Sequence, residues 1–310
     1  MAAATASTSF IDPQALMRIR NLELRAKTVV EGFWHGLHRS PYHGFSVEFT
    51  EYRPYTAGDD PRYLDWRLVA RTDRYYIKKF EDETNLRCQL LVDLSRSMTF
   101  GSTGYTKAEY ASTLAATLGY FLGKQGDAVG LLTFDEAIRE YLPPRNRPGH
   151  LRQLMLSLEK PPTGKGTDIA APLRRMAEIT RKRGLVVLIT DFLSPLESLE
   201  GALSLLTAAR HEVLVFHLLD PAERDFAFDQ PSRFRDLESG REIYLDPAVA
   251  RPEYTRRLAE HQAGIRALCE QLGVSYRQWA TDEHLELALF DFLRARAERH
   301  KVTIRRKMRA

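Results

Sequence analysis

Residues 90–98 read Leu-Leu-Val-Asp-Leu-Ser-Arg-Ser-Met, an apolar run that ends in oxygen-bearing side chains. Asp93, Ser95 and Ser97 occupy alternating positions just past its apolar core. Hard cations such as Mg²⁺ and Mn²⁺ prefer carboxylate, hydroxyl and water oxygens. The segment therefore predicts a buried strand that ends at a small, oxygen-rich cation site.

Two later segments offer further oxygen ligands. Thr167 stands just before a helix-like stretch, and a second apolar run, residues 185–190, ends at Asp191. One carboxylate and two hydroxyls cannot fill an octahedral coordination sphere, so we expect these residues to join it. Asp-x-Ser-x-Ser alone is a weak signal, because Asp and Ser are common in turns and helix caps. The Asp-x-Ser-x-Ser segment followed in order by Thr167 and Asp191 is a stronger signal of a metal site.

This order of residues resembles the metal-ion-dependent adhesion site of von Willebrand factor A domains, in which Asp-x-Ser-x-Ser is followed by a Thr and then an Asp. The resemblance implies the metal ligands Asp93, Ser95, Ser97, Thr167 and Asp191. Phe192 is a departure, because many of these domains have Gly after the last Asp. We expect its ring to restrict the loop.

The segment before the site resembles the DUF58 family of bacterial proteins. The pieces that carry this resemblance are Glu51-Tyr-Arg-Pro-Tyr, Gly58-Asp-Asp-Pro-Arg, Asp65-Trp and Ala70-Arg. The family implies a von Willebrand A-like domain whose gene often lies beside that of a MoxR-type AAA+ ATPase. The implied function is a non-enzymatic protein-interaction module. It would work with such an ATPase, or bind a client's carboxylate, in chaperone-like maturation or assembly.

Apolar strands and amphipathic helices alternate after residue 85. The expected strands are 86–92, 128–134, 185–190, 212–219 and 274–279. The expected helices are 107–124, 147–158, 169–182, 196–209 and 252–272. The alternation predicts an α/β fold, von Willebrand A-like and Rossmann-like, with a mostly parallel sheet and helices on both faces. Ligands of such sheets bind beyond the carboxyl ends of the strands, where Asp93 and Asp191 fall.

The remaining segments complete the expected domain organisation. Its parts are a flexible tail over 1–18, a small β-rich segment over 19–85, the von Willebrand A-like domain over 86–297 and a basic tail over 298–310. Helical spacing also covers residues 17–30. Residues 137–142 predict an antiparallel edge strand. Residues 224–246 predict a β-hairpin insert near the rim of the site.

Composition excludes several classes of protein. The 310 residues contain no apolar run long enough to span a membrane, and the start lacks a secretory signal, so we expect a cytoplasmic protein. The two cysteines, Cys88 and Cys269, stand in no metal-binding spacing. The net charge of +4 arises largely from the C-terminal tail, and no nucleic-acid-binding motif accompanies it.

Two alternatives to an interaction module remain open, namely a Mg²⁺-dependent phosphoryl-transfer or hydrolytic enzyme and a metal-free scaffold. A carboxylate-held Mg²⁺ can serve phosphoryl transfer. However, Ser95 stands where a dehalogenase-like phosphatase has its second Asp, and residues 164–167 lack the spacing of a P-loop. We therefore expect no enzymatic activity. The client, the oligomeric state and the role of the turn at residues 58–62 are left open.

Overall fold

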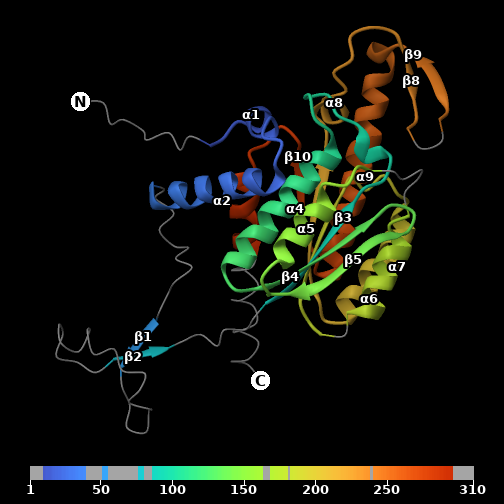
Figure 1. The fold of residues 1–310 in the computed structure, drawn as a ribbon. Coiled ribbons are helices and arrows are strands. Elements are labelled where there is room, and N and C mark those ends of the chain that lie inside the picture. The colour runs from blue at the N-terminus through green and yellow to red at the C-terminus, as the bar shows by residue number, and fades with distance from the viewer. Residues whose placement is uncertain are drawn as a thin grey trace.

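A six-stranded sheet forms the centre of the molecule in a computed structural model of the chain (Figure 1). The structure describes residues 10–39, 51–54, 76–79, 86–162, 168–180, 182–237 and 240–295. The strands are β3 (Arg87–Asp93), β4 (Ala128–Phe134), β5 (Ile138–Arg145), β6 (Leu185–Thr190), β7 (Glu212–Leu219) and β10 (Ser275–Ala280).

The strand order in this sheet is β10-β7-β6-β3-β4-β5. Its neighbouring strands run parallel, except that β5 runs antiparallel beside β4. The edge strand predicted over residues 137–142 is therefore found, and so is the predicted mostly parallel α/β sheet. β3 and β6 are parallel neighbours in the centre of the sheet. Their carboxyl ends therefore lie side by side at the same end of the sheet.

Helices cover both faces of the sheet (Figure 1). One face carries α2 (Leu22–Arg39), α4 (Lys107–Lys124), α5 (His150–Leu158) and a helical segment over 285–295. The other carries α6 (Ala170–Ile179), α7 (Leu196–Ala208) and α9 (Pro247–Leu272). Along β3, Leu90 and Val92 pack into the first layer, whereas Leu91 packs into the second. Burial on both faces explains why the strands read as continuous apolar runs.

The N-terminal helical region differs from the single helix predicted over residues 17–30. It forms α1 (Pro13–Met17) and then α2, because the Asn21 side chain accepts a hydrogen bond from the Leu24 amide, at 2.7 Å, and starts a second helix. α1 falls within the stretch predicted as a tail, and its Leu16 is buried in the main core. The division of the chain into domains stays a prediction.

Two small sheets stand apart from the central one. β1 (Glu51–Pro54) pairs antiparallel with β2 (Tyr76–Lys79), while the predicted turn at residues 58–62 and the basic tail over 298–310 lie outside the described residues. β8 (Ser232–Arg235) pairs antiparallel with β9 (Glu242–Leu245). These two strands form the predicted hairpin insert, which projects beside one end of α9 (Figure 1).

α9 begins five residues earlier than its predicted start at residue 252. Asp246 caps the helix by accepting a hydrogen bond from the Ala248 amide, and Pro247 occupies the first turn. Proline is favoured at that position, whereas Pro252, where the helix was predicted to begin, lies inside it.

Candidate metal site

The residues predicted as metal ligands meet at the carboxyl ends of β3 and β6. Asp93 is the last residue of β3 and Asp191 follows β6, and neither side chain is exposed. Ser95 and Ser97 are also buried, with Ser97 opening a short 3-10 turn, Ser97–Thr99. The structure thus brings together four of the five predicted residues, whose role as ligands stays a prediction.

Thr167, the fifth predicted ligand, lies outside the described residues. The next residue, Asp168, donates a backbone hydrogen bond to the Asp135 carbonyl at 3.2 Å. Asp135 directly follows β4, the strand beside β3. Asp168 also accepts a hydrogen bond from the Ala170 amide at 2.9 Å, at the start of α6. The described part of this loop therefore returns to the strand next to Asp93.

Hydrogen bonds fix both oxygens of the Asp93 carboxylate. Oδ1 accepts from the Ser95 amide at 2.9 Å, and Oδ2 accepts from the Thr190 hydroxyl at 2.6 Å. The Ser95 and Ser97 hydroxyl oxygens lie 3.1 Å apart, and Ser97 also bonds to Asp191. This network joins the ends of β3 and β6 and holds the acidic side chains in place.

A buried lysine, which the sequence analysis missed, faces this cluster. Lys107 is the first residue of α4, and its Nζ lies 2.9 Å from Asp191 Oδ2 and 2.6 Å from Glu223 Oε1. Burial alone lowers the pKa of this ammonium, but the two carboxylates outweigh that effect and raise the pKa above its ordinary value. Lys107 is therefore charged at every physiological pH.

The sequence held a signal for Lys107. Thr106 and Glu109 form a capping box that starts α4, so a lysine between them lies at the positive end of the helix dipole. A cation is disfavoured there unless an acidic group compensates. Glu223 supplies part of that compensation from the capping box of α8 (Pro221–Asp225), where its carboxylate accepts a hydrogen bond from the Asp220 amide at 3.0 Å.

The cluster carries more negative than positive charge. Asp93, Asp191 and Glu223 set three carboxylates against the one ammonium of Lys107, a formal sum of −2. Burial, reinforced by the charge of Asp191, raises the pKa of Asp93 to about 7. Burial acts in the same direction on Asp191, but Lys107 outweighs it and lowers the pKa of that carboxyl. An uncompensated buried charge is costly, so the cluster favours a further cation.

The donor set fits a small, hard divalent cation. The two positive charges of such an ion would balance the formal charge of −2. Carboxylate and hydroxyl oxygens are the ligands that hard cations prefer. No group of three or more His, Cys, Asp or Glu side chains lies within reach of one ion in the described part of the chain. An ion here would therefore rest on the two aspartates together with hydroxyl groups. Lys107 engages Asp191 Oδ2, while Oδ1 accepts a hydrogen bond from the Leu193 amide at 3.4 Å.

Phe192 occupies a strained position directly after Asp191. Its φ of 53° lies in the left-handed region, which a bulky residue rarely adopts. Its amide donates to the Thr190 hydroxyl at 3.2 Å, and its carbonyl accepts from His261 Nε2 at 2.8 Å. The buried ring packs edge-on against His217 at 5.4 Å between centroids. The loop after Asp191 is thus anchored by backbone and side chain together.

Several solved structures resemble this chain. An aerotolerance-related membrane protein from Bacteroides fragilis is 17% identical, with a TM-score of 0.46, over 66% of this chain and 97% of that one. BatB from Bacteroides thetaiotaomicron is 16% identical, with a TM-score of 0.46, over 69% and 99%. The VWA domain of SpRpn10 is 12% identical, with a TM-score of 0.39, over 65% and 92%. Similarities this distant carry no inference about activity.

Sequence relatives cover more of the chain. The uncharacterized protein Rv1480 of Mycobacterium tuberculosis is 30% identical over 276 residues, which make up 87% of this chain and 86% of the relative. A second relative, from Mycobacterium bovis, matches with the same identity and coverage. Among the described residues, no helix is both long and apolar enough to cross a membrane. The family model described as "Protein of unknown function DUF58" matches residues 51–264, and the chain belongs to this family.

Proposed function

We propose that this protein is a metal-gated protein-interaction module. The observation that carries the proposal is the buried pair Asp93 and Asp191, which lies at adjacent strand ends among hydroxyl groups in a cluster with more negative charge than Lys107 balances. The proposed ligands are Asp93, Ser95, Ser97, Thr167 and Asp191. Membership of DUF58 and a von Willebrand A-like fold support an interaction module in general, and the acidic pair supports its dependence on metal.

The residues around the pair prepare the site for an ion. When bound, Mg²⁺ or Mn²⁺ would supply two positive charges and an exchangeable position for a partner's carboxylate. Asp93 is oriented by Ser95 and Thr190, so little side-chain motion is needed on binding. Lys107 keeps Asp191 ionised, because its ammonium lowers the pKa of that carboxyl. Partner binding would then be strong only in the presence of metal.

The proposed partner is a MoxR-type AAA+ ATPase, or a client protein that offers a carboxylate, in chaperone-like maturation or assembly in the cytoplasm. The hairpin insert gives such a partner a second contact. Ile243 and Tyr244 on β9 and Val249 in the first turn of α9 are 59%, 71% and 77% exposed, although all three are hydrophobic. Exposed hydrophobic residues on a projecting hairpin are a feature of surfaces of interaction.

An aromatic cluster connects the hairpin to the candidate metal site. Phe226 packs against Phe234 of β8 and against Tyr254 of α9, with ring centroids 5.8 and 4.4 Å away. The Tyr254 hydroxyl donates to the Glu223 carbonyl at 2.7 Å, and the Glu223 carboxylate holds Lys107. A partner on the hairpin would therefore contact a structure that is continuous with the site.

A pull-down in Mg²⁺ and in EDTA tests the proposal, with a purified MoxR-type ATPase from the same genome as the bait. We expect the wild-type chain to be retained in Mg²⁺ only and Asp93→Ala to be lost in both buffers. Glu178→Ala, which removes an exposed carboxylate on α6, is the matched control and should behave as wild type. If the chain is retained equally well in EDTA and as the Asp93→Ala variant, metal gating is refuted. Turnover of common phosphoesters with Mg²⁺ would favour the enzyme alternative.

Lys107 favours a second candidate, the metal-free scaffold. Its ammonium lies on Asp191 and gives the acidic cluster an internal cation. In this case the chain would bind partners without metal, and Mg²⁺ would leave both its stability and its partner binding unchanged. The same pull-down separates the two candidates.

A further inference from the structure

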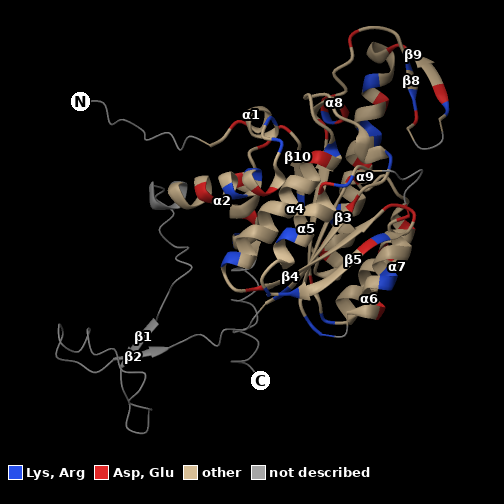
Figure 2. Cartoon of the chain, viewed as in Figure 1, with Lys and Arg blue, Asp and Glu red and all other residues tan. Residues whose placement is uncertain are grey.

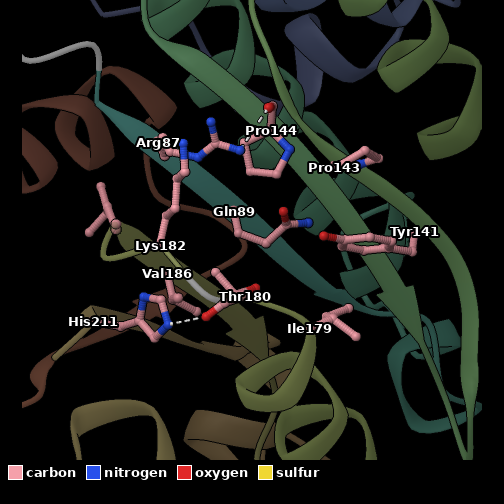
Figure 3. A pocket seen from close by; sticks show the side chains of 12 residues that line it. Arg87, Gln89, Tyr141, Pro143, Pro144, Ile179, Thr180, Lys182, Val186 and His211 are labelled. Carbon is pink, nitrogen blue, oxygen red and sulfur yellow. Dashed lines mark hydrogen bonds between the residues drawn. The ribbon is translucent and has the colours of Figure 1, made fainter. Parts of the chain in front are cut away.

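We propose that a second pocket, at the opposite edge of the sheet, binds a small carboxylate that also carries a hydrogen-bond donor. The pocket holds about 210 Å³ and lies at the amino ends of β3 and β6, between β5 and the end of α6 (Figure 3). It shares no lining residue with the Asp93 site, which lies at the carboxyl ends of the same strands. The proposal is therefore independent of metal binding.

Gln89 is the residue that points to a ligand. Its side chain lies on β3 and is only 2% exposed, yet neither its amide nitrogen nor its amide oxygen has a hydrogen-bond partner. A buried amide without partners is costly, so such groups are usually paired with protein, water or ligand. Figure 3 shows the amide turned toward Tyr141 on β5, within the pocket. Gln89 thus offers an NH2 donor group and a carbonyl acceptor to whatever fills this space.

Two glycines make room around β3. A Cβ atom on Gly130 would lie 2.3 Å from Gln89 Oε1, so any side chain there would displace the amide. A Cβ atom on Gly184, which lines the pocket, would lie 2.4 Å from the Arg87 carbonyl oxygen. The pairing of β4 with β5 also shifts register between Val129 and Leu131, close to Gly130. The absence of a side chain at Gly130 therefore leaves room for the Gln89 amide, which a residue with a Cβ at that position would displace.

The wall of the pocket has a basic part and an apolar part. Arg87 and Lys182 line it, and Figure 2 shows Lys and Arg on the loops at this lower end of the sheet. Arg87 also donates to the Pro144 carbonyl at 3.4 Å. His211 contributes a further buried atom without a partner, Nδ1, while its Nε2 lies 3.2 Å from the Thr180 carbonyl oxygen. The apolar wall comes from Tyr141, Pro143, Pro144, Ile179, Leu185 and Val186.

These features select the class of ligand. The basic side chains favour an anion, and a guanidinium pairs well with the planar, two-oxygen geometry of a carboxylate. The Gln89 amide nitrogen can donate to a ligand oxygen, while its amide oxygen needs a hydroxyl or N–H from the same molecule. The apolar wall accepts a small hydrocarbon or aromatic group. An aromatic 2-hydroxy acid combines all three features.

Three related compounds test this chemistry on the full-length chain by titration calorimetry. Mandelate has the carboxylate, the hydroxyl and the ring, whereas phenylacetate lacks the hydroxyl and mandelamide lacks the negative charge. We expect mandelate to bind with a dissociation constant in the millimolar range or tighter. We expect phenylacetate to bind at least about tenfold more weakly, because it leaves the buried amide oxygen of Gln89 unpaired. Mandelamide should also bind more weakly, because it has no negative charge to pair with Arg87 and Lys182.

Variants locate the binding. Gln89→Leu removes the amide at similar volume, and Lys182→Ala removes an exposed cation whose loss leaves the core intact. Gln89→Leu should weaken mandelate binding at least about tenfold, because it removes a buried group that the ligand pairs with. Lys182→Ala should weaken it by up to about fivefold, because an exposed ion pair contributes less. Lys27→Ala on α2, another exposed lysine, and Asp93→Ala should bind mandelate as wild type does. If Gln89→Leu does not fold, Lys182→Ala still decides the question.

Three outcomes would overturn the proposal. The first is the absence of any heat of binding when mandelate is titrated to 20 mM, or to about tenfold that concentration. This result would mean that water alone pairs with Gln89. The second is equal binding of mandelate, phenylacetate and mandelamide, which would indicate unspecific contact. The third is mandelate binding that survives both Gln89→Leu and Lys182→Ala.

Discussion

The ammonium of Lys107 lies 2.9 Å from Oδ2 of Asp191, and neither side chain is exposed to solvent. α4 supplies the cation and the loop after β6 supplies the carboxylate. The ion pair therefore joins a helix that covers the sheet to the carboxyl end of a central strand. The same ammonium is shared with Glu223 of α8. Lys107 thus balances part of the charge that a metal ion would otherwise have to balance alone.

Lys107→Met should destabilise the metal-free protein and tighten its metal binding. Breaking a buried ion pair while one partner stays charged costs about 3–5 kcal/mol. The variant leaves three carboxylates without a cation, so added Mg²⁺ should raise its melting temperature more than that of wild type. Thermal denaturation in EDTA and in Mg²⁺ measures both effects.

Lys124→Met is the matched control for that experiment, because it makes the same change at the exposed end of the same helix. It should follow the wild-type curve in both buffers. Equal Mg²⁺-induced shifts for Lys107→Met and wild type would contradict a role for Lys107 in the charge balance of the site.

Asp93→Asn should gain stability relative to wild type as the pH rises in metal-free buffer. In the folded chain the pKa of Asp93 is raised from 3.8 to about 7, chiefly by burial and then by Asp191. A folded state that binds its proton more tightly than the unfolded state loses stability as the pH rises from about 4 to about 7. The rise in the pKa from 3.8 to about 7 corresponds to roughly 4 kcal/mol of stability, which the neutral Asn does not lose.

His217 makes the comparison with a variant necessary. Burial lowers the pKa of this imidazole to about 4, so the folded state loses stability as the pH falls from about 6.5 to 4. That slope opposes the slope from Asp93 within the same pH range, but it is present in both proteins and cancels in their difference. Urea unfolding at pH 4.5, 6 and 8 in EDTA gives this difference. If the difference in unfolding free energy between Asp93→Asn and wild type does not change with pH, the pKa of Asp93 is not raised in the folded chain.

Phe192→Gly should be at least as stable as Phe192→Ala. Both variants lose the buried ring, which costs about 3–5 kcal/mol for a large-to-small change. Ala must then adopt a φ of 53°, which disfavours any residue with a Cβ, whereas Gly adopts it freely. Chemical denaturation of the two variants measures the balance. A Gly variant that is about 1 kcal/mol less stable, as in an ordinary strand or helix, would show that the loop relaxes and stores no strain.

Tyr244→Ser should impair partner binding without changing stability. The side chain is 71% exposed on β9, and substitutions at such positions alter stability by about 0.5 kcal/mol or less. Retention by the ATPase in Mg²⁺ should nevertheless fall. Leu24→Ser on α2, another exposed apolar position, is the control and should bind normally. Normal retention of Tyr244→Ser would remove the hairpin from the proposed interface.

The sequence predicted the frame of the site better than its electrostatics. The strands over 128–134, 185–190 and 212–219 have their predicted bounds, because apolar runs of strand length bounded by polar residues permit few alternatives. The meeting of Asp93 with Asp191 followed from the rule for ligand sites in parallel sheets. Their use as metal ligands stays a prediction.

The partners of Lys107 and the roles of Glu223 and Gln89 could not be predicted from the sequence for a physical reason. Their significance lies in contacts between elements distant in the chain, such as α4 with α8, or in the absence of a contact, as for the Gln89 amide. Periodicity reports which residues are buried but not which polar atoms remain unpaired. The end of α6 was missed for a similar reason, because the helix stops at Ile179 without a Gly or Pro to mark its end.

Calorimetric titration of the purified chain with Mg²⁺ and Mn²⁺ at pH 7.5 tests the central claim most directly, with Asp93→Asn measured beside wild type. The account predicts one saturable binding event per wild-type chain and none for Asp93→Asn, even though that variant folds. Equal binding by both proteins, or no binding to a wild-type chain whose partner binding is intact in EDTA, would contradict it.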